Sequence, residues 1–579
     1  MEAFTTDDGS RSLRSDRYGE PYRSRHGARS ESWHVFVAGS GVAARLAAGL
    51  PTTVLELGLG SARNLGISAA VAFAAGTRLH YVALEHEVPS AEAWERQERD
   101  ALGPPAFRAA LLEARSRWDV HRGGRFDLGV GPVSFELHVG DAAAARWPAA
   151  LDAAYLDGFS PAVNPELWTA ELLGRLAADL RPGGTAVSYC VQGRVRRTLA
   201  ALGLRVEKRP GPPGGKREVL WAQRRPSGAP LAALRGTALA GRRLAVVGAG
   251  VVGSSLALAA ALAGAEVTLF DATDGMGGAS GVPAALVNPY RGRAGRATPE
   301  DRLGARATWR WAAELHAAGF DPGAHPSGVV RIADRPRQAR AWLGREGVIG
   351  FGPELDPEPG RWRAAHGGML VPSGGWIDPW RWLGALREAA GAVGTRWCPG
   401  QHVRALERAA SASTLHGDGL DDQGPFDLVT LCLGASAPGA LPHLQVTALP
   451  GTVALCAGHA PARPLAGPVY VAAVGSPVRY GLDPRRAYLA LGGGNPALPD
   501  EAGERLRRAV DRLPREPLAP PETIWRGVRA RGPDPQPQVA ALAPGVWWLG
   551  GFSGRGFLRA ALEAERLVAH WSTHSRDAG

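Results

Sequence analysis

Lysine, cysteine and long apolar runs are scarce in this chain of 579 residues. The four cysteines, Cys190, Cys398, Cys432 and Cys456, lie far apart and form no CxxC pair, which argues against a disulfide scaffold and against a zinc cluster. The longest apolar run, near residues 256–265, is about half the length that a membrane span needs. We therefore expect a reduced, cytoplasmic protein with no membrane segment and no metal site.

Positive charge in this chain comes almost wholly from arginine. Lysine occurs only at Lys208 and Lys216, although the formal net charge is +11. The guanidinium group fits the geometry of phosphate, so a polyanionic partner such as RNA is compatible with this composition. Charge alone does not identify that partner.

The length of the chain predicts two to four domains. The first 30 residues are rich in Arg, Ser and Gly and have no apolar segment, so we expect a disordered basic tail and not a signal peptide. Alternating strand-like and helix-like patterns predict two α/β units joined by a Pro/Gly/Ala linker. The expected boundaries are 31–225 for the first unit, 226–241 for the linker and 242–579 for the second unit, with a substrate domain inserted at roughly 300–420 and 440–530.

The first unit contains a glycine-rich turn between a strand and a helix, VLELGLGSARN at 54–64. An apolar strand reaches Glu56, and Gly58 and Gly60 follow it. Glycine lets the backbone pass close under a ligand, and the helix beyond offers free N–H groups. This pattern predicts a nucleotide-binding loop.

Two acidic residues further along indicate an adenosine ligand. The next strand, LHYVALEHE, ends in Glu85, whose carboxylate can accept both ribose hydroxyls, and Asp141 lies at the turn that usually faces the adenine. Loop and acids together resemble the S-adenosylmethionine site of class I methyltransferases. Any other Rossmann-like crossover is the alternative. Ala62 and Arg63 depart from the usual pattern of a small residue followed by an apolar one, which puts the affinity for this cofactor in question.

A rigid loop with an acid follows a later strand, in LDGFSPAVNPELWT at 156–169. Ligands of doubly wound folds bind at the carboxyl ends of the strands. Asp157 stands at such an end and could hold an amine that attacks a methyl group, because methyl transfer needs little beyond in-line positioning of a neutral amine. The alternative is an acid that only shapes the turn.

The second unit opens with a full GxGxxG at Gly248, Gly250 and Gly253, between a strand and an Ala/Leu-rich helix. The next strand ends in Asp271, which is placed to hold the ribose of a dinucleotide. The motif alone does not distinguish NAD from FAD.

More distant segments favour FAD. GGASGVPAALVNPYRG resembles the segment along the flavin in glycine-oxidase-like and D-amino-acid-oxidase-like enzymes. Near the end of the chain, Gly551 and Gly554 precede the last helix. The N-terminus of such a helix would stabilise the negative charge of a reduced flavin.

Several segments, in their order along the chain, resemble the family of bifunctional tRNA 5-methylaminomethyl-2-thiouridine biosynthesis proteins. Those that resemble its methyltransferase half are YRSRHGARSESWHVFVAGS, VLELGLGSARN, LEHEVP, LDGFSPAVNPELWT, RPGGTAVSYCVQGRVRRTLAALG and KRPGPPGGKREVL. GGWIDP and RGVRARGPDPQPQVAAL resemble its oxidoreductase half. In the second of these, Arg529 corresponds to an arginine near the substrate carboxylate, and GPDPQPQ departs from the family's fuller basic and apolar pattern.

The resemblance implies an α/β chain in which a Rossmann-like class I methyltransferase domain precedes a glycine-oxidase-like FAD domain with an inserted α+β substrate domain. It also implies FAD and S-adenosylmethionine as cofactors and the anticodon stem-loop of a tRNA as partner. The FAD domain would remove the carboxymethyl group of a modified wobble uridine, and the first domain would methylate the resulting amine. Glu85 would hold the ribose, the loop from Glu56 to Gly60 the methionine part, and Asp157 the amine.

Two other functions stay open at this point. The chain could be a flavin oxidase of small amines fused to a methyltransferase domain that does not act on tRNA. The first domain could alternatively be an RNA-binding module without cofactor, although Glu85, Asp141 and Asp157 argue against that. The basic stretch at 194–218 could bind phosphates or be an ordinary solvated face. The oligomeric state is also open, and a monomer is one of the options.

Overall fold

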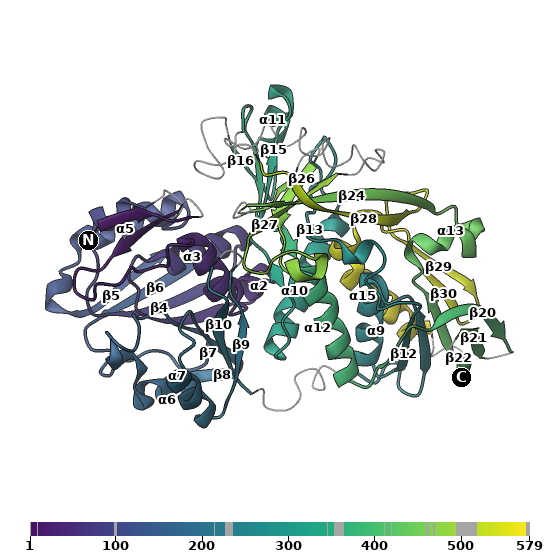
Figure 1. Cartoon of the computed structure of the whole chain (residues 1–579), viewed down its shortest axis with the longest axis horizontal. Coiled ribbons are helices and arrows are strands. Elements are labelled where there is room, and N and C mark those ends of the chain that lie inside the picture. The colour runs from purple at the N-terminus through teal and green to yellow at the C-terminus, as the bar shows by residue number, and fades with distance from the viewer. Residues whose placement is uncertain are drawn as a thin grey trace.

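The computed structural model of the chain divides into two halves along its longest axis (Figure 1). It describes residues 2–574 except 8–9, 98–100, 213–214, 226–235, 344, 352–363, 410–411, 419, 459–462, 467–468 and 494–517. Most of the expected linker at 226–241 therefore lies outside the described residues.

The N-terminal half is built on one eight-stranded sheet with the order β5-β6-β4-β3-β7-β8-β10-β9. In that order the strands are Gly124–Val130, Val133–Val139, Leu79–Glu85, Thr52–Leu57, Leu151–Leu156, Leu180–Ser188, Glu218–Arg224 and Leu204–Pro210. The five strands from β6 to β8 are parallel, whereas β5, β10 and β9 pair antiparallel with their neighbours. The prediction of a parallel unit is thus confirmed at the centre and wrong at both edges. A two-residue turn at Gly131 and Pro132 joins β5 to β6, and so short a connection permits only an antiparallel pair.

Helices cover both faces of this sheet. Those on one face are α2 (Val42–Ala47), α3 (Arg63–Ala75) and α5 (Pro105–Arg117), and those on the other are α6 (Ala170–Asp179) and α7 (Gly193–Ala201). Successive residues of a strand face opposite sides, so Val54 packs with the first group of helices and Leu55 with the second. This burial on both faces explains why the central strands are apolar throughout.

The N-terminal segment contradicts the prediction of a disordered tail. Its described part contains an antiparallel pair, β1 (Glu2–Thr5) and β2 (Arg11–Arg14), and then a short helix, α1 (Ala28–Glu31). Between β2 and α1 the chain contacts Asp157 and Ser160, which follow the strand Leu151–Leu156, and buries Arg23. Sequence composition could not predict this order, because Asp157, with which Arg23 forms an ion pair, lies 134 residues away in the sequence.

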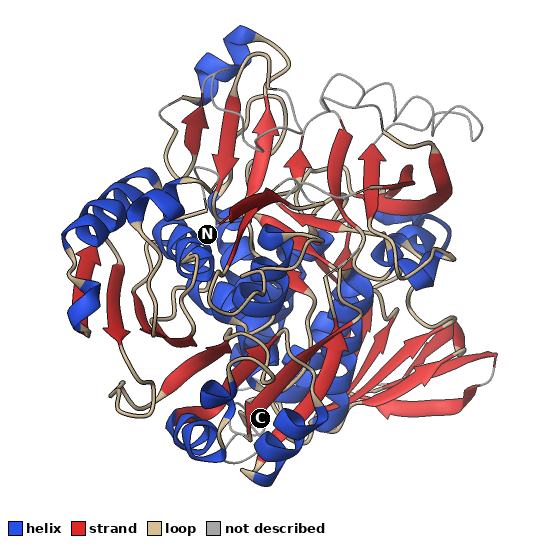
Figure 2. Ribbon diagram, turned by 60° about the vertical axis from the view of Figure 1, so that its left-hand side comes forward, coloured by secondary structure: helices blue, strands red, loops and turns tan. Residues whose placement is uncertain are grey.

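The C-terminal half contains a six-stranded sheet with the order β19-β12-β11-β23-β30-β29. In that order the strands are Arg396–Pro399, Glu266–Asp271, Arg243–Val247, Leu428–Leu431, Val546–Gly550 and Gln538–Ala543. Only β29 is antiparallel to its neighbour. Helices α9 (Val251–Leu262), α10 (Pro299–Ala317), α12 (Pro379–Ala392) and α15 (Gly556–His574) share one large apolar core, and helices fill the centre of the molecule in Figure 2.

A second eight-stranded sheet forms the inserted domain, with the order β16-β17-β15-β25-β26-β27-β24-β28. In that order the strands are Ile349–Phe351, Gly368–Val371, Val329–Ile332, Leu465–Ala466, Val469–Ala473, Tyr488–Gly493, Thr447–Ala457 and Pro521–Arg531. Because β19 pairs with β12 in the nucleotide sheet, the expected first insertion at 300–420 extends too far. This half also contains the helices α11 (Pro336–Trp342) and α13 (Ala437–Ala440) and two three-stranded sheets. One sheet has β13 (Ala285–Val287), β18 (Gly375–Ile377) and β14 (Ala324–His325), and the other has β20 (His402–Arg408), β21 (Ser413–Asp418) and β22 (Leu420–Phe426).

The two halves contact one another through hydrogen bonds and packing. The side-chain amide of Gln223, in β10, donates to the carbonyl oxygens of His316 and Ala317 at the end of α10, at 3.1 Å each. The indole N–H of Trp33 lies 3.2 Å from Nδ1 of His325. Within the described residues, no helix is both long enough and apolar enough to cross a membrane.

Candidate active sites

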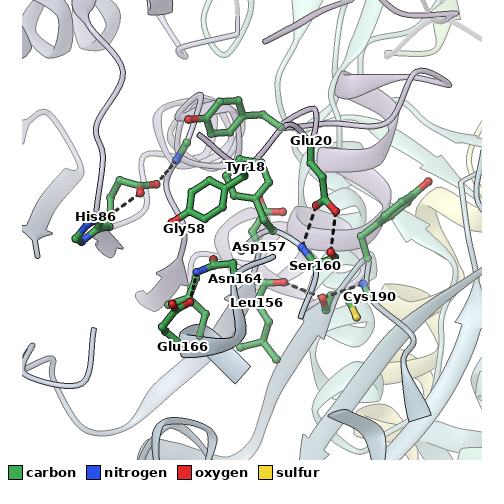
Figure 3. Close-up of a pocket in the computed structure, with 18 of the residues that line it drawn as sticks. Tyr18, Glu20, Gly58, His86, Leu156, Asp157, Ser160, Asn164, Glu166 and Cys190 are labelled. Carbon is green, nitrogen blue, oxygen red and sulfur yellow. Dashed lines mark hydrogen bonds between the residues drawn. The ribbon is translucent and has the colours of Figure 1, made fainter. Parts of the chain in front are cut away.

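A cavity of about 920 Å³ opens at the carboxyl ends of the central strands of the first sheet. It is lined by five of the predicted site residues, Gly58, Gly60, Glu85, Asp141 and Asp157. Figure 3 shows this cavity with Asp157 between the glycine loop and the loop that carries Ser160. Residues from the ends of four strands, β3, β4, β6 and β7, therefore meet around one space large enough for a nucleoside ligand and a substrate group.

The glycine loop passes so close to neighbouring residues that a side chain at either glycine would collide with them. Gly58 has φ +89°, and a Cβ there would lie 2.9 Å from the carbonyl oxygen of Asp157. Gly60 has φ +49°, and its Cβ would lie 2.5 Å from the ring of Tyr22. Both glycines are therefore required by backbone conformation and by space, which fits a loop that cradles a ligand.

Glu85 stands at the end of β4 and is held by backbone N–H groups. Its carboxylate accepts hydrogen bonds from the N–H of His86 at 2.7 Å, Gly60 at 2.9 Å and Glu87 at 3.1 Å. Burial raises the pKa of Glu85, and these hydrogen bonds oppose the rise. Asp141 follows β6, where its Oδ1 accepts the N–H of Ala143 at 2.9 Å. Both carboxylates line the cavity, as a ligand with ribose and adenine parts requires.

Glu56 lies behind the cavity wall and does not line it. It is fully buried, accepting a hydrogen bond from the Tyr81 hydroxyl at 2.8 Å and one from Nδ2 of Asn64 at 2.7 Å. Burial and the nearby Asp157 raise the pKa of Glu56. Its contacts therefore support the loop and Asn64 from beneath.

Asp157, directly after β7, is one of the acids that line the cavity. Its carboxylate accepts a hydrogen bond from Nδ2 of Asn64 at 2.8 Å and forms an ion pair with Arg23. Burial raises the pKa of Asp157, while Arg23 and Asn64 act to lower it. Asn64, shared with Glu56, fixes the orientation of the carboxylate.

The N-terminal segment supplies cavity residues that were not predicted as site residues. Glu20 accepts hydrogen bonds from the hydroxyl of Ser160 at 2.7 Å and from its N–H at 3.1 Å (Figure 3). The rings of Tyr18 and Tyr22 lie 4.6 Å and 5.1 Å from that of Phe159. A signal was available for Tyr22 alone, because the segment that resembles the family begins at that residue, whereas Tyr18 and Glu20 precede it.

Lys216, one of the two lysines, lies on another wall of the cavity. Its ammonium group donates to the carbonyl oxygen of Tyr189 at 2.9 Å and lies 4.6 Å from the centre of the Tyr189 ring. The lysine thereby anchors the stretch after β8 to the start of β10.

The GxGxxG loop of the second half has the close packing of a dinucleotide loop. Gly248 has φ +101°, and a Cβ there would lie 2.4 Å from the carbonyl oxygen of Cys432. A Cβ on Gly253 would lie 1.8 Å from the carbonyl oxygen of Gly248. The loop can take this path only with glycine, and it leads directly into the N-terminus of α9.

Asp271 and Gly250 complete this loop. The Oδ2 atom of Asp271, at the end of β12, accepts the N–H of Ala249 at 2.7 Å. A Cβ on Gly250 would lie 2.9 Å from the hydroxyl of Ser280, which accepts the N–H of Val251 at 3.0 Å. Loop, acid and helix terminus therefore stand in the arrangement that binding of a dinucleotide needs.

A second cavity, of about 390 Å³, lies where the inserted sheet meets the starts of α9 and α15. Arg529 and Gly554 line it, together with Arg291, Arg331 and Tyr470. Arg291 donates to the carbonyl oxygen of Gly554 at 3.0 Å. Burial, together with the charge of neighbouring arginines, lowers the pKa of Arg291 to about 10. The cavity thus presents cationic groups to an anionic substrate part.

Gly551 lies outside this lining. It has φ +69° at the end of β30, and a Cβ there would lie 3.0 Å from Oε1 of Gln538. It shapes the turn that delivers Gly554. In the described part of the chain, no group of His, Cys, Asp or Glu side chains could hold a metal ion.

Two family profiles match the chain. That of S-adenosyl-L-methionine-dependent methyltransferases matches residues 108–225, and that of FAD dependent oxidoreductases matches residues 243–571.

Curated relatives match both halves together. The tRNA 5-methylaminomethyl-2-thiouridine biosynthesis bifunctional protein MnmC of Caulobacter sp. (strain K31) is 31% identical over 95% of this chain and 91% of its own length. The protein of the same name from Azoarcus sp. (strain BH72) is 32% identical over 96% and 92%. Glycine oxidase from Geobacillus kaustophilus is a structural neighbour with 20% identity, covering 57% of this chain and 95% of its own, with a TM-score of 0.47.

Proposed function

This chain belongs to the family of bifunctional tRNA 5-methylaminomethyl-2-thiouridine biosynthesis proteins, and we propose that it modifies the wobble uridine of a tRNA in two successive steps. It is a bifunctional enzyme in which a methyltransferase domain that uses S-adenosylmethionine precedes an oxidoreductase domain that uses FAD. The oxidoreductase acts first and the methyltransferase second.

The first step removes a carboxymethyl group from the amine at carbon 5 of the base. FAD, when bound, would accept a hydride from the C–H bond of the methylene group next to the nitrogen, while the N–H proton is released to water and a C=N bond forms. Hydrolysis of the resulting imine then releases glyoxylate and leaves a primary amine. Arg529 binds the carboxylate of the leaving group, and the support for this is its position with Arg291 in the second cavity. Gly248, Gly250, Gly253 and Asp271 hold the dinucleotide.

The second step methylates the primary amine. S-adenosylmethionine supplies the methyl group: the amine nitrogen bonds to the methyl carbon, the carbon–sulfur bond breaks with its electrons left on sulfur, and a secondary ammonium results. Glu85 and Asp141 bind the adenosine part beside the glycine loop, and the Asp157 carboxylate accepts a hydrogen bond from an N–H of the amine. The meeting of these groups around one cavity is the observation that carries the proposal.

The base has to leave the anticodon stack to enter either cavity, as base-modifying enzymes generally require. Arginines on both halves bind the tRNA phosphates, with the basic stretch at 194–218 as the main candidate on the first half. Binding of tRNA is then strongly weakened by salt.

The decisive experiment uses the purified full chain and tRNA that carries carboxymethylaminomethyluridine. The tRNA is incubated with and without S-adenosylmethionine, and its nucleosides are analysed by mass spectrometry. We expect the aminomethyl product without this cofactor and the methylaminomethyl product with it. Unchanged tRNA, together with flavin that is reduced by a free amino acid, would instead establish a small-molecule amine oxidase.

A further inference from the structure

A single arginine of the N-terminal segment reaches the acid at the centre of the methyltransferase cavity. Arg23 and Asp157 are 134 residues apart in the sequence, yet they form an ion pair with side-chain exposures of 3% and 10%. Glu31 is a second acid beside Arg23, with 3.7 Å between Nη1 and Oε1. The buried guanidinium is thus the cation that faces Asp157 most directly.

Neighbouring carboxylates stabilise the positive charge of Arg23. Burial acts to lower the pKa of Arg23, but Asp157, Glu31 and Glu56 outweigh it and raise the pKa. Arg23 also stacks over the ring of Phe36, with 5.3 Å from its carbon to the ring centre. A permanently charged group is therefore fixed at the wall where the acceptor amine has to bind.

Other titratable and charged groups surround the pair on every side. They are Glu31 from α1, Glu56 from β3, Tyr81 and Glu85 from β4, Glu20 and Tyr22 from the N-terminal segment, and Tyr189, Cys190 and Lys216, which also line the cavity. Glu56 is held by Tyr81 and Asn64, and Glu31 accepts the N–H of Ser24 at 3.1 Å. Arg23 alone among them bonds to the carboxylate of Asp157 as a cation.

We propose that Arg23 is a positioning residue for methyl transfer, which holds the Asp157 carboxylate toward the cavity and favours the neutral form of the acceptor amine. This inference rests on the proposed function. A primary alkylamine is mostly an ammonium ion at neutral pH, and it has no lone pair to attack with until it gives a proton to water. A carboxylate alone would stabilise the ammonium, whereas an adjacent guanidinium offsets that effect.

Removing Arg23 shifts the pH dependence of methyl transfer in the same direction whether the amine or Asp157 takes the proton. Without the guanidinium, either the amine or Asp157 binds a proton more tightly. The reactive state, with Asp157 ionised and the amine neutral, is then reached only at higher pH. The rising limb of the pH profile for methyl transfer therefore moves to higher pH.

The test compares Arg23→Met and Arg23→Lys with Arg14→Met in the full-length protein. Arg14 is an exposed arginine of the same N-terminal segment whose guanidinium bonds to the carbonyl oxygen of Gly19, so it is a matched control. Single-turnover methyl transfer to tRNA that carries aminomethyluridine is followed from pH 6 to pH 10, values chosen to span about two units below and above the ionisation expected for the amine. Affinity for S-adenosylmethionine is measured in parallel.

A second readout needs no turnover. The same tRNA is titrated into protein loaded with S-adenosylhomocysteine, and calorimetry in buffers of different ionisation enthalpy gives the protons released. We expect the wild type to release about one proton at neutral pH, because it binds the neutral form of an amine that is protonated in water. Arg23→Met should release clearly less, and Arg14→Met should match the wild type.

We expect Arg23→Met to shift the rising limb upward by about one pH unit or more, with affinity for S-adenosylmethionine preserved, and Arg23→Lys to stay near the wild-type limb. A uniform loss of rate at every pH, with wild-type proton release, would overturn the inference and leave Arg23 a structural residue. If Arg23→Met does not fold, Arg23→Lys decides, because a displaced limb in a variant that keeps the charge contradicts the inference. Absence of methyl transfer by the wild type at every pH would overturn the proposed function itself.

Discussion

The Nη2 atom of Arg63 lies 3.0 Å from Oε1 of Gln97, on the side of the glycine loop that faces away from the cavity. Arg63 is 1% exposed, and Gln97 in turn donates to the carbonyl oxygen of Ser61 at 2.8 Å. The unusual residue after Ala62 therefore braces the loop from behind. It leaves the cavity, lined by Gly58 and Gly60, open to a cofactor.

Replacing Arg63 with Met should lower stability and leave cofactor affinity nearly unchanged. The variant leaves Gln97 without its buried donor, which costs about 1–3 kcal/mol. Thermal unfolding and calorimetric titration with S-adenosylmethionine measure the two effects. The matched control is Arg117→Met, an exposed arginine paired with Glu113 on the surface of α5, where such pairs contribute little. Weak binding of S-adenosylmethionine at unchanged stability would contradict this assignment.

The sequence predicted those parts of the sites that are local in the chain. Gly58, Gly60, Gly248 and Gly253 stand in short motifs whose conformation depends on a few neighbouring residues. The structure places the first three in turns and Gly253 at the start of α9, and at each position an added side chain would collide with a neighbour. Asp157 was predicted because it directly follows a buried strand. Such signals need no knowledge of distant contacts.

Sequence could not predict the features that arise from distant contacts. The direction of Arg63 depends on Gln97, and the order of the N-terminal segment depends on the burial of Arg23 against Asp157. Glu56 was expected to bind the methionine part, but its hydrogen bonds to Tyr81 and Asn64 turn it away from the cavity. In each case the sequence offers the side chain several possible partners, and only the packed structure identifies the partner that it contacts.

Glu31 should make the stability of the methyltransferase domain depend on pH. Burial raises the pKa of Glu31 to about 7, above its value of 4.5 in an unfolded chain. The folded state thus binds this proton more tightly, so the stabilisation is complete below pH 4.5 and is lost as the pH rises through 7.

The Glu31→Gln variant keeps an acceptor for the N–H of Ser24 and removes this titration. Relative to the wild type, its stability should increase between pH 4.5 and pH 7 by on the order of 2 kcal/mol. Urea unfolding at several pH values checks this, with Glu113→Gln at an exposed site of α5 as control. A difference that stays constant over the window would show that Glu31 does not titrate there.

Substitution of Gly253 with Ala should remove FAD and spare methyl transfer. The new Cβ would lie 1.8 Å from the carbonyl oxygen of Gly248, so the loop has to move, and we expect FAD binding at least about tenfold weaker. Flavin absorbance of the purified protein and methylation of tRNA that carries aminomethyluridine are measured together. Gly384→Ala is the control, because Gly384 lies in α12 with nothing within 4 Å of the new Cβ. A purified Gly253→Ala protein with a full complement of bound FAD would show that this loop does not hold the cofactor.

Replacing Arg529 with Met should impair the oxidation step alone. Arg529 lines the second cavity near Gly554, and a charge-assisted hydrogen bond to the substrate carboxylate contributes about 1.5–3 kcal/mol. The value of kcat/KM for tRNA that carries carboxymethylaminomethyluridine should therefore fall about 10- to 100-fold, while methylation of aminomethyl tRNA is unchanged. Arg526→Met, an exposed arginine of the same strand β28, is the matched control. Equal losses in the two variants would mean that the strand contributes through tRNA binding or folding and that Arg529 does not contact the carboxylate.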